Sequence, residues 1–182
     1  SILADSDDNL WIGCLDGDMA CFPSHHSSRE GGNKSVFYLP IKEVQCITES
    51  LDKRSIAVGT SNGCYLIDKH SSFQFRRFFQ AEQYSNVDMN LFVNSMVYSQ
   101  HIWIATDGGG LIFYNLKTNK IRIYTTHESL PSNSVYALVK GADGKLWIST
   151  DKGLALMNHG KIVNLNLFKG LEREYKRMSV VC

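Results

Sequence analysis

The sequence predicts an all-β protein built from four-stranded antiparallel blades, and three observations support this. One short pattern occurs four times: an aliphatic residue, Trp (once Ala), Ile or Val, a small residue, then Thr or Cys. The copies are evenly spaced, with intervals of 46 (11 to 57), 46 (57 to 103) and 44 (103 to 147) residues. Each period also divides into four short extended runs separated by turn residues. Such a period is typical of stacked-repeat folds, and four short strands per period are typical of a β-propeller blade.

The repeat has two anchor positions, which we interpret as packing and turn chemistry. The Trp position would lie between neighbouring blades, and the Gly six residues later would turn the second strand into the third. In the second copy Ala57 replaces the Trp, so this blade has lost its largest packing group. The anchor residues are Trp11 and Gly17, Ala57 and Gly63, Trp103 and Gly109, and Trp147 and Gly153.

We expect four blades over residues 1–42, 43–92, 93–132 and 133–170, with a fifth blade beginning in residues 171–182. In blade 1 the first strand is 2–4, a turn spans 5–9, and the fourth strand is 36–39. Blade 2 begins at 44–47, turns at 51–54 and ends in a strand at 73–79. Blade 3 has strands at 95–98, 102–106, 111–114 and 120–124. Blade 4 has strands at 134–139, 146–150, 154–157 and 161–167, and the fifth blade starts at 178–181.

The blade number predicts an incomplete ring. A lone four-stranded sheet cannot bury both faces, whereas blades stacked around an axis can. Propellers close with about four to eight blades, and four is the rare end of that range. We therefore expect an open arc cut from a larger propeller, or a piece that pairs with another copy. No helix is expected anywhere in the chain.

Composition excludes several functional classes. The 19 basic and 18 acidic residues give a net charge of +1, which offers no electrostatic reason to expect nucleic acid as a partner, or direct contact of this chain with an anionic membrane. No apolar run approaches the ~20 residues of a membrane helix. The five cysteines contain no C-x-x-C pair, and a Cys14–Cys21 disulfide is left open.

The motifs of phosphate-binding loops, serine hydrolases and zinc proteases are absent. The adjacent pair His25-His26 would point to opposite sides of an extended segment, so one metal would rarely take both. We predict no catalytic residue, no metal site and no cofactor.

One segment carries a specific resemblance. Residues 128–138 (ESLPSNSVYAL), 143–150 (DGKLWIST) and Gly153-Leu154 resemble the two-component regulator propeller repeat. That repeat reads approximately G-L-P-S-N-S-V-Y-A-I, a D-x-x-G turn, then L-W-I-G-T-x-x-G-L, and this copy departs from it at Ser129 and Ser149. Weaker copies, at 94–97 with 102–111, at 10–17 and at 56–63, extend the resemblance over the whole chain at blade level.

The resemblance implies a location and a role. Propellers of this family form the periplasmic sensor region of hybrid two-component systems, which are common in gut Bacteroidetes. They occur as two large propellers before a small β-sandwich, one membrane span and a histidine kinase, and their ligands are usually glycans. The resemblance therefore implies a periplasmic segment of an inner-membrane sensor that self-associates, binds an oligosaccharide and controls polysaccharide-utilisation genes. The chain itself would not be an enzyme.

The motif residues themselves are interpreted as scaffold, with Asn133 capping nearby backbone groups. A glycan would instead meet loops at one end of the blades. The two richest loops, 80–94 and 125–133, both follow the fourth strand of a blade, so we expect them on the same face. The candidate ligand-binding residues are Tyr84, Asn86, Asp88, Asn90, His127 and Glu128.

Two other functional classes remain open from the sequence. A protein-interaction scaffold predicts a protein partner and no saccharide binding. A carbohydrate-active propeller enzyme predicts turnover of a glycan and a buried pair of acids. The preferred interpretation is a non-catalytic sensor in which ligand shifts the population between two arrangements of the protomers.

Overall fold

The computed structural model describes residues 1–24, 36–80 and 92–165. Within these ranges, four antiparallel sheets follow one another along the chain, each of four strands in sequential order. Blade 1 contains β1 (Ile2–Ala4), β2 (Leu10–Ile12), β3 (Met19–Phe22) and β4 (Phe37–Leu39). Blade 2 contains β5 (Val44–Glu49), β6 (Ser55–Thr60), β7 (Gly63–Asp68) and β8 (Phe75–Phe79). Blade 3 contains β9 (Val93–Tyr98), β10 (Ile102–Thr106), β11 (Leu111–Asn115) and β12 (Lys120–Tyr124). Blade 4 contains β13 (Val135–Lys140), β14 (Leu146–Thr150), β15 (Gly153–Asn158) and β16 (Lys161–Leu165).

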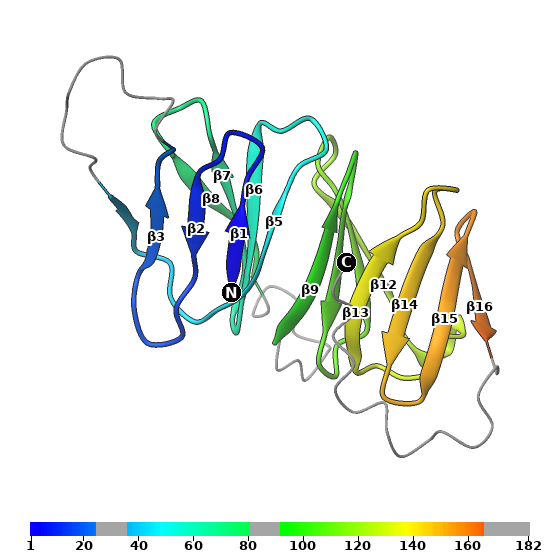
Figure 1. Cartoon of the computed structure of the whole chain (residues 1–182). Helices are drawn as coiled ribbons and strands as arrows, with labels where there is room; N and C mark the ends of the chain where they lie inside the picture. Colours follow the sequence, from blue (N-terminus) through cyan, green and yellow to red (C-terminus); the bar gives the residue numbers. More distant parts are fainter. Residues whose placement is uncertain (25–35, 81–91, 166–182) are drawn as a thin grey trace.

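The blades are arranged in an open arc, with blade 1 at one end and blade 4 at the other (Figure 1). The first strands of neighbouring blades contact one another, β5 with β9 and β9 with β13, so they form the inner side of the arc. The prediction of all-β propeller blades is therefore confirmed. The expected start of a fifth blade lies outside the described residues.

Neighbouring blades interlock through a small residue on one blade and a valine on the next. A Cβ added to Gly13 would lie 2.2 Å from Val44 Cγ1, and one added to Gly59 would lie 2.5 Å from Val93 Cγ1. The small residue after the Trp-Ile pair of the repeat therefore leaves room for the first strand of the next blade. At the corresponding positions, Ala105 and Val135 are both buried in the cluster between blades 3 and 4.

The Thr of the repeat closes the turn between the second and third strands. Its Oγ1 donates to a glycine carbonyl in three blades: Thr60 to Gly63 at 3.0 Å, Thr106 to Gly110 at 2.7 Å and Thr150 to Gly153 at 2.8 Å. Gly63 and Gly153 adopt positive φ angles of 138° and 127°, which favour glycine. In blade 3 the positive φ angles fall at Gly108 and Gly110, on either side of the anchor Gly109.

Two local expectations differ from the structure. The last strand of blade 2, expected from residue 73, begins at Phe75, because Ser72 and Phe73 adopt left-handed φ angles of 52° and 56° that end an extended run. A 3-10 turn, Thr126–Glu128, interrupts the link between blades 3 and 4 where no helix was expected. Thr125 and Glu128 cap it reciprocally, which is a local pattern of the capping-box type.

The described cysteines, Cys14, Cys21, Cys46 and Cys64, are free thiols. Within residues 1–24, 36–80 and 92–165, no cluster of three or more His, Cys, Asp or Glu side chains could hold a metal ion. None of the helical segments in these same ranges has the length and apolar character needed to cross a membrane.

Candidate functional site

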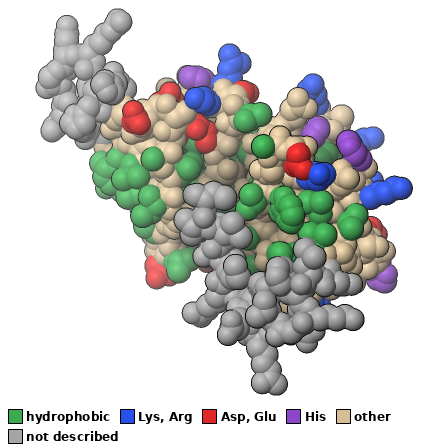
Figure 2. Space-filling model, turned by 45° about the vertical axis from the view of Figure 1, so that its right-hand side comes forward, with side chains coloured by type: hydrophobic (Ala, Val, Ile, Leu, Met, Phe, Trp, Pro, Cys, Tyr) green, Lys and Arg blue, Asp and Glu red, His purple; other side chains and the backbone are tan. Residues whose placement is uncertain are grey.

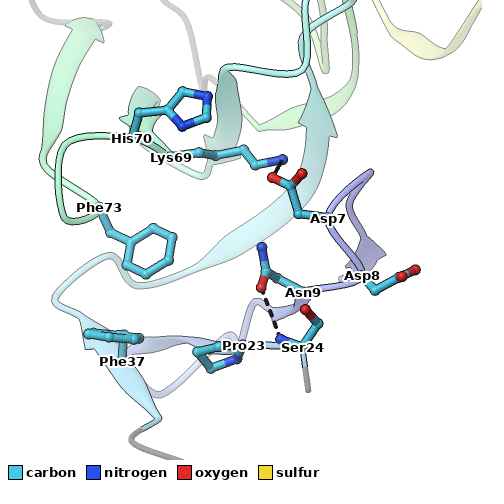
Figure 3. Close-up of a pocket in the computed structure, with 9 residues that line it drawn as sticks. All are labelled: Asp7, Asp8, Asn9, Pro23, Ser24, Phe37, Lys69, His70 and Phe73. Carbon is cyan, nitrogen blue, oxygen red and sulfur yellow. Dashed lines mark hydrogen bonds and ion pairs between the residues drawn. The ribbon is translucent and has the colours of Figure 1, made fainter. Parts of the chain in front are cut away.

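The turns of each blade emerge at two opposite edges of its sheet, because consecutive strands are antiparallel. The turns after first and third strands share one edge, and the links between blades share the other. At the first edge, a pocket of about 720 Å³ lies between blades 1 and 2 (Figure 3). This volume is typical of small-molecule sites. The pocket is lined by Asp7, Asp8, Asn9, Pro23, Ser24, Phe37, Lys69, His70 and Phe73.

A buried carboxylate shapes the blade 1 side of the pocket. Asp5 directly follows β1, and its side chain accepts hydrogen bonds from the backbone of Asp7 and of Asn9, both at 2.9 Å, and from Trp11 Nε1 at 2.8 Å. Burial alone would raise the pKa of Asp5, but these hydrogen bonds outweigh burial and leave the pKa lowered. The carboxylate therefore holds the 5–9 turn in one conformation and fixes the indole of Trp11.

Lys69 ties the two blades together beneath the pocket. It follows β7, and its ammonium lies 3.2 Å from Asp5 Oδ2, 2.7 Å from Asp7 Oδ2 and 2.6 Å from Glu49 Oε1. The side chains of Lys69 and Asp5 are 2 % and 0 % exposed, whereas Asp7 is 57 % exposed, so the cluster of one cation and three carboxylates is buried on one side and open to the pocket on the other. Burial lowers the pKa of Lys69, but the hydrogen bonds to the carboxylates outweigh it and raise the pKa overall.

An aromatic wall stands opposite the carboxylates. The Phe73 ring lies 5.3 Å from the Trp11 ring, edge to face, and 4.9 Å from the Phe37 ring. Phe37 is 42 % exposed and lies beside Pro23 at the floor of the pocket in Figure 3. The left-handed backbone at Phe73 is rarely adopted by a bulky residue, and such strain concentrates at functional sites. The surrounding contacts hold the ring in place.

Polar groups form the rim between these two walls. Asn9 Oδ1 accepts a hydrogen bond from the Ser24 backbone at 3.0 Å, and Asp68 Oδ1 accepts one from the His70 backbone at 2.8 Å. Figure 3 shows Asn9 and Asp7 near the centre of the pocket, with the Asp8 side chain directed outward. Burial and the nearby charge of Asp5 raise the pKa of Cys21 to about 12, so this thiol stays protonated. Aromatic faces beside carboxylate, amide and imidazole groups provide binding chemistry for a polar ligand with an apolar face.

Of the residues predicted as ligand-binding, the two that the structure describes lie away from this pocket. Tyr84, Asn86, Asp88 and Asn90 fall outside the described residues. His127 and Glu128 lie in the β12–β13 link, at the edge opposite the pocket. Glu128 Oε2 accepts hydrogen bonds from the backbone and the hydroxyl of Thr125, both at 2.8 Å, and these two bonds lower its pKa. Glu128 is thus engaged in capping the 3-10 turn.

Sequence reasoning missed the pocket, although a signal was present. The 5–9 turn follows the first strand of blade 1, and residues 69–74 follow the third strand of blade 2. Antiparallel order places both turns at the same edge of adjacent blades. The acids of the first turn and the Lys69-His70 pair of the second could therefore have been brought together before the structure was known.

Comparison with known families identifies one repeat. Residues 129–152 match the model of the two component regulator propeller family, which confirms the resemblance seen in the sequence. Asn133 lies within this segment; its Oδ1 accepts a hydrogen bond from the Thr126 backbone at 2.9 Å, and its carbonyl accepts one from Gly110 at 2.8 Å. No curated protein matches the chain significantly.

Three solved structures show the shared fold. The extracellular domain of a protein assigned as a hybrid two component system, from B. thetaiotaomicron, is 23 % identical, with a TM-score of 0.66, over 91 % of this chain and 22 % of that chain. The extracellular domain of a protein assigned as a one component system, from the same organism, is 24 % identical, with a TM-score of 0.65, over 90 % and 21 %. Virginiamycin B lyase from Staphylococcus aureus is 16 % identical, with a TM-score of 0.68, over 90 % and 54 %. The chain thus spans about a fifth of the length of the first two.

Proposed function

We propose that this chain is a non-catalytic, ligand-sensing segment of the periplasmic region of a two-component sensor, and that it recognises a saccharide. The two component regulator propeller repeat at residues 129–152 is the observation that carries the sensor assignment. Likeness of fold to extracellular domains of such systems supports it. Because a propeller lyase shares the fold as well, the fold alone does not decide between sensing and catalysis.

The pocket between blades 1 and 2 supports a saccharide as the ligand. A pyranose ring has an apolar face that stacks on aromatic rings, and Phe37 and Phe73 supply such a surface. Its hydroxyls need hydrogen-bonding partners at the ring edge, and Asp7, Asn9 and His70 lie there. The ligand would span two blades, so its binding energy would depend on the arrangement of one blade relative to the next.

The proposed signal is a shift in population. A ligand that favours one arrangement of two protomers of the intact sensor would pass that bias to the kinase. Measurement of kinase activity and protomer arrangement in the intact sensor tests this step. If ligand binds but changes neither, the signalling part of the proposal is wrong.

The saccharide part is tested by binding to an array of defined oligosaccharides. We expect the chain to retain at least one oligosaccharide, Phe37→Ala to weaken that binding about tenfold or more, and His127→Ala to leave it unchanged. Failure to bind any saccharide on the array would contradict the proposal. Loss of binding in His127→Ala alone would place the site at the opposite edge of the blades. Turnover of a bound glycan would favour an enzyme instead of a sensor.

A further inference from the structure

The pocket carries an excess of negative charge. Three carboxylates share the single ammonium of Lys69. Of these only Asp7 lines the pocket, and Asp8 is the second carboxylate of the lining. Among the described residues that line the pocket, Lys69 is the only Lys or Arg. Its ammonium is fully engaged by Asp5, Asp7 and Glu49, so it is not free to bind an anionic ligand.

One carboxylate is placed to meet a ligand. The Asp5 side chain is fully buried, and Glu49 also accepts hydrogen bonds from Ser6, so both are committed to the protein. The Asp7 side chain is 57 % exposed, and its Oδ2 lies 2.7 Å from the Lys69 ammonium. Figure 3 shows Asp7 directed toward the pocket, across from Phe73 and above Asn9. Asp7 therefore offers a partly exposed carboxylate, shared with Lys69, within a surplus of negative charge.

The opposite wall excludes a simple ion site. The exposed edge of Phe37, the Phe73 ring and Pro23 present a broad apolar surface rather than further oxygen ligands. A cation that fits must carry an apolar body large enough to cover these rings. An aromatic face also attracts a cation directly, which adds to the effect of the carboxylates.

We infer that the pocket between blades 1 and 2 selects a saccharide that carries a protonated amine, with the ammonium at Asp7 and the sugar ring on Phe37 and Phe73. This inference rests on the proposed function and names the ligand class for the same site. A uronate-bearing saccharide would place its carboxylate against Asp7 and Asp8 and would be disfavoured by like-charge repulsion. A neutral saccharide would keep the stacking contact but lose the charge contact.

The test is calorimetric titration of the 182-residue chain with three tetrasaccharides, composed of glucosamine, N-acetylglucosamine and galacturonate. The first two differ mainly in whether the amine is charged, and about pH 6 keeps most of the amines protonated. We expect the glucosamine oligomer to bind about threefold to fivefold tighter than the acetylated one, the magnitude of one partly exposed ion pair. Because the ion pair is screened by salt, raising the ionic strength should reduce the preference.

Two variants locate the selectivity. Asp7→Asn should remove most of the preference while leaving Lys69 paired with Asp5 and Glu49. Asp143→Asn is the matched control, because Asp143 is a half-exposed carboxylate in the first turn of blade 4, at the same edge of the arc but away from the pocket. It should bind all three oligomers as the unmodified chain does.

Each other outcome overturns a specific part. Equal or tighter binding of the acetylated or galacturonate oligomer, lost in Phe37→Ala, would reject the amine and keep the saccharide pocket. Binding of trilysine as tightly as the glucosamine oligomer would reject the saccharide and leave a general cation site. Absence of binding by all three oligomers would reject the inference, and failure of the wider oligosaccharide array as well would reject the proposed ligand class.

Discussion

Trp11 and Trp147 occupy the same position of the repeat but have different surroundings. Trp11 is 0 % exposed between blades 1 and 2, and its Nε1 donates to the buried Asp5. Trp147 is 41 % exposed on the outer face of blade 4, beside an apolar hollow of about 310 Å³. Figure 2, which brings this end of the molecule forward, shows hydrophobic side chains gathered on the surface there. The Trp of the repeat therefore stabilises the packing of one blade on the next where a next blade is present. The candidate site is formed by the turns at the edge of the interface between blades 1 and 2.

The difference extends to the residues around the two indoles. Gly13 and Gly59 each face a valine of the following blade, and Ala105 is buried in the cluster that contains Val135 of the following blade. Ser149 instead lines the hollow on blade 4. At the other end of the arc, Ile2 of β1 is 70 % exposed. Both end faces thus expose apolar side chains of the kind that are buried at the interfaces inside the arc.

The largest expected effect comes from deleting the two indoles. Trp11→Ala should destabilise the chain by about 3–5 kcal/mol, because it leaves a cavity and removes the hydrogen bond that Trp11 Nε1 donates to Asp5 Oδ2. Trp147→Ala should cost less than about 1 kcal/mol, because its ring is already partly in water. Urea unfolding followed by circular dichroism measures both. Equal losses would mean that the two positions do not differ in packing.

Breaking the ionic cluster should have the next largest effect. Lys69→Met leaves three carboxylates without their shared cation, and removing one partner of a buried pair costs about 3–5 kcal/mol. Since Asp5 keeps its other hydrogen bonds, we expect the lower end of this range, about 3 kcal/mol. The control is Lys145→Met, at the exposed Asp143 pair, which should cost less than about 1 kcal/mol. A similar cost in both variants would show that the cluster does not join the blades.

Filling the small positions tests the interlocking of blades. Gly59→Ala adds a Cβ that would lie 2.5 Å from Val93 Cγ1 and 2.7 Å from Cys46 Sγ, so overpacking should cost about 1–3 kcal/mol. Ser149 is 6 % exposed but lines the apolar hollow of blade 4, which leaves room for a larger side chain, so Ser149→Val should cost less than Gly59→Ala. The two changes are compared by the midpoint of urea unfolding. A neutral Gly59→Ala would show that the interface is loosely packed.

The smallest effect concerns pH. The lowered pKa of Asp5 means that its contribution to stability is present above its unfolded value, 3.8, and is lost as pH falls through its folded value. The raised pKa of Lys69 means that its contribution is present below its unfolded value, 10.5, and is lost as pH rises through its folded value. The unfolding free energy should therefore lose these contributions only at the acidic and alkaline extremes. In Lys69→Met the alkaline loss should become smaller but not vanish, because the raised pKa of Cys21 also makes stability fall at alkaline pH. An unchanged alkaline limb would contradict this assignment.

The sequence was sufficient to predict the blades, because the repeat encodes them locally. Trp147 and Gly153 mark strand and turn in a pattern that needs no tertiary information, and the resemblance at residues 129–152 was confirmed by the family match. The predicted start of β8 was wrong because Phe73 has a high strand propensity but adopts a turn conformation. Its contacts with Trp11 and Phe37 fix that conformation. Propensity gives no sign of such a tertiary constraint.

The pocket was not predicted, because it depends on pairs far apart in the chain. Asp5 and Lys69 meet only when blade 1 packs on blade 2, and neither residue belongs to the repeat motif. The sequence instead directed attention to polar loops after fourth strands. In the described part of those loops, Glu128 hydrogen-bonds to its own turn, a role that its local sequence, Thr125 followed three residues later by Glu, could have indicated.

The most direct test of the proposed site is to follow backbone amide shifts by NMR while the glucosamine tetrasaccharide is added to the chain. The location between blades 1 and 2 predicts shifts at Asp7, Asn9, Lys69 and His70, with His127 and Glu128 unchanged. Shifts confined to His127, Glu128 and their neighbours would contradict it and would place the ligand at the links between blades, on the opposite edge of the arc.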